Sequence, residues 1–275
     1  MEKVIKVNYD SDIVNYLKIE GFGKNKVKTY VKLGFVYVND RVINKLPYKL
    51  VLGDIIRIST VINDLEIVYE DDNYLIVNKE AHLLSIGTDK KVIEDTLYRR
   101  VRDYLNKKRE YAFIVNRIDK ETSGLVVFVK NDKLKEKLQS NWNDIVKKRG
   151  YIAIVSGVID REGKIDNYLY EDKMTFSHST NYGGKRAITM YKPIKNNNKY
   201  TMLDINILTG RKNQIRVHFS EMKHPIVGDK KYGSHDNKFN RLMLHHYEIS
   251  FICPISGKLL DFKVGIPNEF YSLFD

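Results

Sequence analysis

Residues 114–130 constrain the fold more than any other stretch of this chain. Ile114 and Val115 are β-branched, and residues 125–129 form a second short run of aliphatic, β-branched and aromatic side chains, so both predict buried strands. Residues 119–124 between them are too polar for a core and too few for a helix. We therefore expect a surface turn held between two buried strands, a rigid position from which a side chain can contact a ligand.

Asp119 is the chemically distinctive residue of this turn. Arg117 and Lys120 flank it in the sequence, and nearby cations favour the ionised form of a carboxyl group, which predicts a lowered pKa for Asp119. An ionised carboxylate can act as a nucleophile. The alternative is a turn aspartate with a local hydrogen bond, beside solvated basic residues and the turn formers Ser123 and Gly124.

This stretch resembles the signature of the RluA-type pseudouridine synthases, which usually has the form His-Arg-Leu-Asp, two variable residues, Thr-Ser-Gly-Leu and an apolar strand. The resemblance places Asp119 on the catalytic aspartate of the family. It places Arg117 on the arginine that enters the space left by the extruded uridine. Asn116 stands where the family usually has histidine, and since that histidine is not the nucleophile, we expect an effect on turn geometry more than on chemistry.

A second segment, residues 147–157, resembles the family's basic residue and tyrosine at the start of a strand that ends at glycine. The resemblance places Tyr151 on the active-site tyrosine. In the family its ring lies against the target base, and its hydroxyl is a proposed proton acceptor. Without the resemblance, a tyrosine near a strand start is ordinary half-buried packing.

A third segment, residues 208–218, resembles the family's Thr-Gly-Arg motif and its continuation, with Asn213 again in place of histidine. Arg216 falls on the arginine that pairs with the catalytic aspartate, and Arg211 is a candidate RNA contact. We expect alternating side chains here, so that Ile215 and its neighbour Val217 face the core while Arg216 points into the cleft.

The chain carries a net charge of +12 and has a pI near 9.4, which favours a polyanionic partner, with nucleic acid first and an anionic membrane second. The alternative is compositional, because plentiful Lys, Asn, Ile and Tyr with scarce Pro are what an AT-rich genome would impose. Charge alone therefore gives RNA only partial support.

Residues 11–60 resemble the small alpha-L RNA-binding motif. They predict a short helix with Ile13, Val14, Leu17 and Ile19 on its apolar face, a basic helix over residues 24–34, a strand over 35–38 and a closing strand over 55–58. Lys24, Lys28 and Lys32 on the basic helix would more often form a solvated face. Next to a catalytic domain that acts on RNA, phosphate contact becomes the better interpretation.

We expect two domains: an RNA-binding domain over residues 1–62 and a catalytic domain over residues 63–275, with the seam at residues 61–64. The resemblance implies an α+β fold with a mixed, largely antiparallel bent sheet, preceded by a small α/β domain. Residues 65–79 predict strand, turn and strand, and resemble the family's first motif. Glu80 and His82 replace its usual proline and glycine, so the loop geometry that follows cannot be carried over.

The sequence gives no support for a cofactor or a metal. The single cysteine, Cys253, excludes an intrachain disulfide and a Cys-x-x-Cys site, and no phosphate loop, dinucleotide motif or zinc spacing of histidines is present. No apolar run approaches the roughly 20 residues that a membrane helix needs. We expect a monomeric, cytoplasmic protein without cofactor, metal or membrane partner.

The function implied by the resemblance is isomerisation of specific uridines in RNA to pseudouridine, with large-subunit ribosomal RNA first and tRNA second. An alternative is a non-catalytic RNA-binding or ribosome-assembly protein that retains the fold, as the substitutions Asn116, Asn213, Glu80 and His82 suggest. Against that, Asp119, Tyr151 and Arg216 all stand at matching positions. A DNA-binding protein is a weaker alternative, because nothing resembles a major-groove recognition helix.

Overall fold

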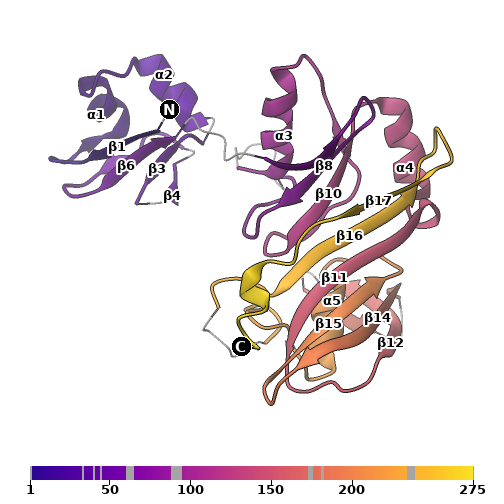
Figure 1. Cartoon of the computed structure of the whole chain (residues 1–275). Coiled ribbons are helices and arrows are strands. Elements are labelled where there is room, and N and C mark those ends of the chain that lie inside the picture. Colours follow the sequence, from indigo (N-terminus) through magenta and orange to yellow (C-terminus); the bar gives the residue numbers. More distant parts are fainter. Residues whose placement is uncertain are drawn as a thin grey trace. The chain divides into compact units, whose positions relative to one another are not determined.

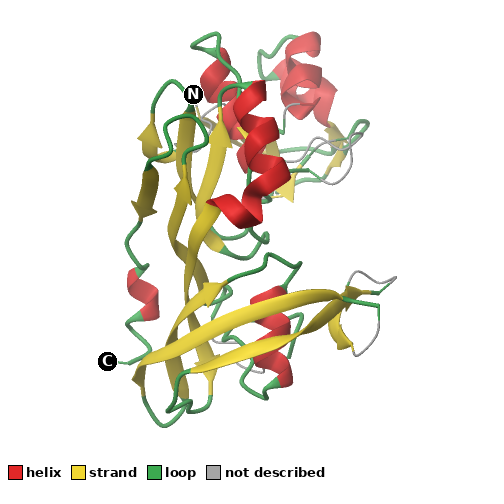
Figure 2. Cartoon of the chain, turned by 90° about the vertical axis from the view of Figure 1, so that its right-hand side faces the viewer, coloured by secondary structure: helices red, strands yellow, loops and turns green. Residues whose placement is uncertain are grey.

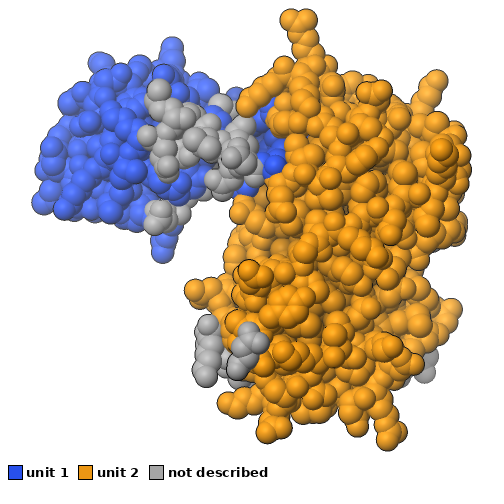
Figure 3. Space-filling view, viewed as in Figure 1, with its two compact units in different colours: residues 1–65, 86–103 blue, residues 66–85, 104–275 orange. Residues whose placement is uncertain are grey.

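The computed structural model forms two compact units, unit 1 with residues 1–65 and 86–103 and unit 2 with residues 66–85 and 104–275 (Figure 3). The predicted domain boundary between residues 62 and 63, and the predicted seam at residues 61–64, lie outside the described residues. The structure describes residues 2–32, 34–39, 41–43, 45–59, 65–87, 95–172, 176–180, 183–233 and 239–274 (Figure 1).

Unit 1 contains two short helices and two small sheets. The side chain of Asp12 caps the first helix by accepting hydrogen bonds from the backbone N–H groups of Val14 and Asn15. The second helix buries Val27 and Val31, one turn apart, and ends near Gly34, which has a φ of +68°. The elements are β1 (Glu2–Lys6), β2 (Ser11–Asp12), α1 (Ile13–Ile19), α2 (Lys24–Lys32), β3 (Val36–Val38), β4 (Arg41–Val42), β5 (Lys49–Leu50) and β6 (Ile55–Ser59).

The strand order in unit 1 is β1-β6-β3-β4, and β2 pairs separately with β5. The predicted helices and the strands at β3 and β6 are present. Strand β1 was not predicted, although it pairs with β6 along its whole length. Ile19, expected on the apolar face of α1, is 72% exposed.

Unit 2 is built on one 11-stranded sheet in the order β13-β12-β14-β15-β11-β16-β10-β8-β7, with β17 beside β16 and β9 beside β10. Helix α3 begins in unit 1 and ends in unit 2. The elements are β7 (Glu66–Glu70), β8 (Tyr74–Lys79), α3 (Leu97–Asn106), β9 (Phe113–Ile114), β10 (Ser123–Val129), α4 (Asp132–Ile145), β11 (Val146–Ser156), β12 (Gly163–Glu171), β13 (Ser177–Thr180), β14 (Lys185–Asn196), β15 (Tyr200–Ile207), α5 (Gln214–Glu221), β16 (Leu244–Ile252), β17 (Leu259–Lys263) and the 3₁₀ helix η1 (Asn268–Phe270).

Neighbouring strands of this sheet pair antiparallel except β10 and β16, which pair parallel. Figure 2 shows that the sheet is bent, because strands in its lower part cross those of its upper part at a steep angle. A bulge between Gly150 and Tyr151 in β11 lies within the long pairing with β16, and such bulges increase the local twist. The predicted mixed, largely antiparallel bent sheet is confirmed.

Strand β10, which follows the Asp119 turn, is fully buried in the sheet. All seven of its residues are buried, and Leu134 and Leu138 of α4 pack in the cluster that covers one side of it. Gly124 has a φ of +118°, and a Cβ at this position would lie 2.2 Å from the backbone oxygen of His246 in β16. Only glycine fits so close to the parallel neighbour, which explains Gly124 at the start of β10.

Candidate active site

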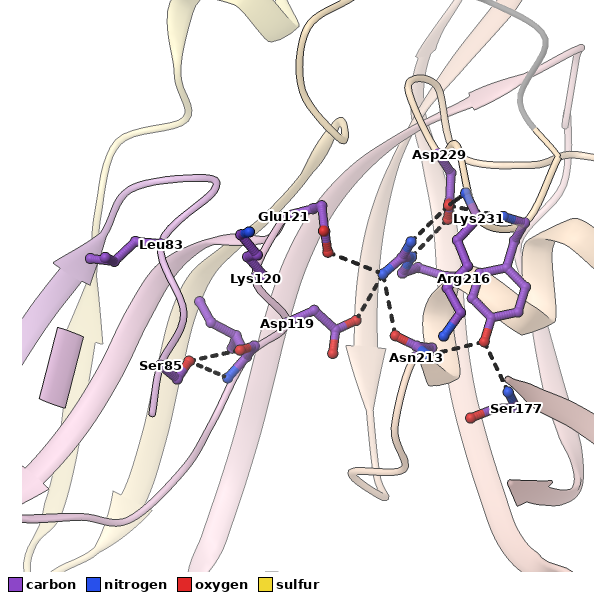
Figure 4. Close-up of polar contacts among 12 residues, drawn as sticks. Leu83, Ser85, Asp119, Lys120, Glu121, Ser177, Asn213, Arg216, Asp229 and Lys231 are labelled. Carbon is purple, nitrogen blue, oxygen red and sulfur yellow. Dashed lines mark hydrogen bonds and ion pairs between the residues drawn. The ribbon is translucent and has the colours of Figure 1, made fainter. Parts of the chain in front are cut away.

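Asp119 lies in the loop between β9 and β10, directly after the buried Ile118. The hydroxyl of Ser85 binds both backbone polar groups of Ile118. It donates to the Ile118 oxygen at 2.7 Å and accepts from the Ile118 N–H at 3.3 Å (Figure 4). The Asp119 side chain is 29% exposed. The predicted turn is therefore present between two strands, but only β10 is buried, because both residues of β9 are half-buried. Its carboxylate follows a buried residue and remains reachable from outside.

Arg216 of α5 connects Asp119 to a buried acid that sequence analysis missed. Its Nη1 lies 3.5 Å from Oδ2 of Asp119 and 3.5 Å from Oε2 of Glu121. Its Nε and Nη2 each donate to a different oxygen of Asp229 at 2.8 Å, a bidentate pair between side chains that are 5% and 0% exposed (Figure 4). Asp229 thus fixes the guanidinium plane that faces Asp119.

Asn213, the residue before α5, also helps to hold Arg216. It has a left-handed φ of 54°, and its side chain accepts from Nη1 of Arg216 at 3.2 Å and donates to the Tyr232 hydroxyl at 3.0 Å. The expected alternation of Ile215, Arg216 and Val217 is wrong, because these residues are helical and all three are buried. Arg216 faces Asp119 because Asp229 and Asn213 hold its guanidinium, not because the backbone alternates as in a strand.

The prediction that cations lower the pKa of Asp119 is also wrong in its net direction. Burial raises the pKa of this carboxyl and outweighs the lowering by Arg216, while Glu121 and Asp229 raise it further. Arg117 and Lys120, the neighbours in sequence, are both exposed. The cation that lowers the pKa of Asp119 is Arg216, which lies 97 residues away along the chain.

Tyr151 lies in β11 next to the bulge and is 7% exposed. Its ring stacks on His246, with centroids 4.4 Å apart and an angle of 18° between the planes. The Nδ1 of His246 lies 2.7 Å from the Leu125 oxygen, which fixes the imidazole. Burial raises the pKa of the Tyr151 phenol, and although Arg149 lowers it, Asp119 raises it, so the hydroxyl stays protonated at neutral pH.

The predicted RNA-contacting residues are distributed over both units. Arg117 is exposed in the Asp119 loop, and within the described residues its side chain makes no hydrogen bond or ion pair. Arg211 is half-buried, and its Nε donates to the Arg186 oxygen at 2.9 Å. In unit 1, exposed lysines four residues apart follow one side of α2: Lys24, Lys28 and Lys32.

Lys79, at the end of β8, is a second residue that sequence analysis did not assign to the site. It is 1% exposed, and its Nζ donates to the backbone oxygens of Glu80, Leu83 and Lys120 at 2.8, 2.7 and 3.2 Å. Burial lowers its pKa to about 7, against a raising effect of Asp119. His82 has a φ of +66°, so this loop keeps a left-handed position where the family usually has glycine.

Asn116, the other departure from the family signature, has a backbone role. Its Oδ1 accepts from the Val127 N–H at 2.7 Å, which joins the strand before the turn to β10. Among the described residues, no group of three His, Cys, Asp or Glu side chains is arranged to hold a metal ion. Within the same ranges, every helix is too short or too polar to cross a membrane.

The chain is similar to known proteins over most of its length. A sequence model described as RNA pseudouridylate synthase matches residues 73–221. Ribosomal large subunit pseudouridine synthase D of Neisseria meningitidis serogroup A is 30% identical, over 92% of this chain and 74% of that protein. The protein of the same name from Haemophilus influenzae is 28% identical, over 92% of this chain and 86% of its own.

A solved structure, Human RNA Pseudouridylate Synthase Domain Containing 1, has the same fold, with a TM-score of 0.64 at 21% identity. The similarity covers 79% of this chain and 89% of that one.

Proposed function

The chain belongs to the RNA pseudouridylate synthase family and is an RNA pseudouridine synthase, and we propose that it isomerises specific uridines of large-subunit ribosomal RNA with Asp119 as the nucleophile. The observation that carries the role of Asp119 is its position beside Arg216, whose guanidinium is fixed by the fully buried Asp229. The names of the bacterial relatives support ribosomal RNA as the substrate. A tRNA is the second candidate substrate. Modification of ribosomal RNA would take place in the cytoplasm, so we propose a cytoplasmic protein.

The reaction breaks the bond between N1 and C1′ of a uridine and joins C5 to C1′, with loss of the C5 proton and protonation of N1. Atoms and electrons balance within one nucleotide, so no redox partner is required. Asp119 acts as the nucleophile in its ionised form. Because burial raises its pKa, Arg216 has the task of keeping enough of the carboxylate ionised near neutral pH.

Extruding a base from a stacked RNA costs a few kcal/mol, which a substitute in the stack offsets. We assign that part to Arg117, because it is exposed two residues before Asp119 and a planar guanidinium stacks well on bases. Tyr151 supports the extruded base with its ring, backed by the stacked imidazole of His246. Its raised pKa makes the phenol a poor acceptor for the C5 proton at neutral pH.

We assign capture of the RNA backbone to the domain of residues 1–62 and to one residue of the catalytic domain. The exposed lysines of α2 and the partly exposed Arg211 are suited to phosphate contact. Such contacts make binding weaken steeply as salt is added. A salt-independent affinity would contradict this assignment.

The test is mapping of pseudouridine in total RNA from cells with and without the gene, complemented by variants. Loss of a defined pseudouridine that wild type restores and Asp119→Asn does not would support the proposal. Glu121→Gln is the matched control, because it removes a carboxylate at the same 3.5 Å from Arg216, and we expect it to restore the modification. Full restoration by Asp119→Asn, or no missing site, would favour a non-catalytic RNA-binding or ribosome-assembly protein.

A further inference from the structure

Four aromatic side chains of unit 2 form a continuous row that starts at Arg216. The Cζ of Arg216 lies 5.3 Å from the ring centroid of Tyr232. From there, ring centroids follow at 5.9 Å to Phe176, 6.2 Å to His178 and 5.6 Å to Tyr170. We call these four residues, from Tyr232 to Tyr170, the aromatic row.

The same polar contacts that hold Arg216 also hold the near end of the aromatic row. The Tyr232 hydroxyl accepts from the Ser177 N–H and from the Asn213 amide, each at 3.0 Å, and Asn213 also contacts Arg216 (Figure 4). At the far end, Tyr170 of β12 and His178 of β13 are direct cross-strand partners, so their side chains share one face of the sheet. Hydrogen bonds and strand pairing therefore hold the two ends of the row, and the near end shares Asn213 with Arg216.

The row is not explained as a small hydrophobic core. Tyr170, at its far end, is 44% exposed, and Phe176, His178 and Tyr232 are each half-buried. A core would enclose its largest rings, whereas these rings keep part of their surface open to solvent along the whole row. Partly exposed aromatics in a line, two of them on the paired strands β12 and β13, are instead suited to stacking on another molecule.

The charges along the row favour a nucleic acid with unpaired bases. The Nζ of Lys231 lies 4.5 Å from the centroid of the Phe176 ring, which places a cation at the near end. The carboxylate of Asp172 lies 3.0 Å from Nε2 of His178, so the far end is not a basic phosphate track, and its most exposed group is the Tyr170 ring. Every base has a π-face, and stacking on aromatic side chains tolerates any sequence.

We propose that the aromatic row stacks the unpaired nucleotides that flank the target uridine in single-stranded RNA. This rests on the proposed function, because the row matters only if the target uridine is bound beside Asp119. Proteins that recognise RNA commonly bind loops and unpaired segments, whose bases can turn onto aromatic rings. The row gives this chain a track for such a segment that begins at Arg216 and ends at Tyr170.

The test is equilibrium binding of fluorescently labelled oligouridylates of three, five, seven and nine nucleotides to the full chain. Wild type should bind more tightly as the oligonucleotide lengthens. Since stacking of one base contributes about 5- to 150-fold in affinity, Tyr170→Ala should weaken binding of the longest oligonucleotides by that factor and leave the trinucleotide unchanged. Tyr170→Phe retains the ring and should bind like wild type.

Tyr168→Ala is the matched control, because Tyr168 is 49% exposed on the same strand and face but pairs with Thr180 instead of an aromatic residue. We expect it to bind all lengths like wild type, with equal thermal unfolding of all variants. Unchanged binding by Tyr170→Ala, an equal loss in Tyr168→Ala, or no length dependence in wild type would overturn the proposal. Binding needs no turnover, so these outcomes are distinct from a failure of Asp119 in RNA mapping.

Discussion

Replacing Asp229 by asparagine should lower both the unfolding stability of the protein and its kcat. The substitution keeps the shape of the side chain but removes the charge that receives two hydrogen bonds from Arg216 at 2.8 Å. Both side chains are almost fully buried, and loss of one partner from a buried ion pair costs about 3–5 kcal/mol. Since the backbone N–H bonds to Oδ1 can remain, we expect the low end, about 3 kcal/mol.

For a unit of this size, that loss lowers the midpoint of thermal unfolding by about 6–12 °C. The same substitution should reduce kcat by about 100-fold, because Arg216 is no longer held in the plane that faces Asp119, and small displacements at a reacting group have effects of that size. The assays are thermal unfolding of the purified protein and release of tritium from ribosomal RNA whose uridines carry tritium at C5.

The matched control is Asp166→Asn. Asp166 makes the same bidentate contact, with two 2.8 Å hydrogen bonds from Arg186, but on the surface. Exposed pairs contribute little, so the unfolding midpoint and kcat should stay near wild type. Equal effects of the two substitutions would refute the reasoning, because burial is what distinguishes the pairs.

A double replacement gives the sharper test. Arg216→Met combined with Asp229→Leu removes both charges of the buried pair, and apolar replacements of such pairs are often neutral or stabilising. We expect the free energy of unfolding to stay within about 1 kcal/mol of wild type. The kcat should be as low as in the worse of the two single variants. Recovery of kcat together with stability would show that Arg216 has no function beyond holding the fold.

Three other changes test the site and its scaffold. Arg216→Gln removes the cation that lowers the pKa of Asp119, so the acidic limb of the kcat–pH profile should move to higher pH; an unchanged limb would mean that Asp119 is not the titrating group. Burial raises the pKa of Glu70, but hydrogen bonds from two lysines and a tyrosine lower it to about 2, so its stabilisation is complete above about pH 5 and is lost as the pH falls toward 2; Glu70→Gln should flatten unfolding free energy against pH there. Gly124→Ala should lower the unfolding midpoint by at least about 10 °C, since its Cβ would meet backbone at 2.2 Å, whereas Gly265→Ala, with open space around it, should not.

Local patterns in the sequence were sufficient where the structure is also locally determined. The turn before β10 and the strand pair β7 and β8 were predicted, because short apolar runs broken by polar turns have few other solutions. The helix α5 was missed as a helix. Its residues from Gln214 to Phe219 are all buried, and a helix enclosed on all sides has no 3.6-residue period of exposure to display in the sequence.

The electrostatics of Asp119 could not be predicted from its neighbours in sequence. Arg117 and Lys120 are adjacent along the chain but point to solvent, whereas the pKa is set by burial and by a guanidinium 97 residues away. Asp229 carried no local signal of its role either. Only the packing of α5 against the loop that follows it brings that carboxylate onto Arg216.

Arg216 contacts three carboxylates in this site, and it contacts them at different distances. Arg216 gives its two best hydrogen bonds to Asp229, which is fully buried, and contacts Asp119 and Glu121 only at 3.5 Å with the remaining Nη1. A tighter bond to Asp119 would stabilise the ionised acid further but would also occupy the lone pairs that attack the substrate in the proposed reaction. The looser contact leaves Asp119 partly exposed and with a raised pKa, so the bidentate pair with Asp229 allows Arg216 to orient the proposed nucleophile without occupying its oxygens.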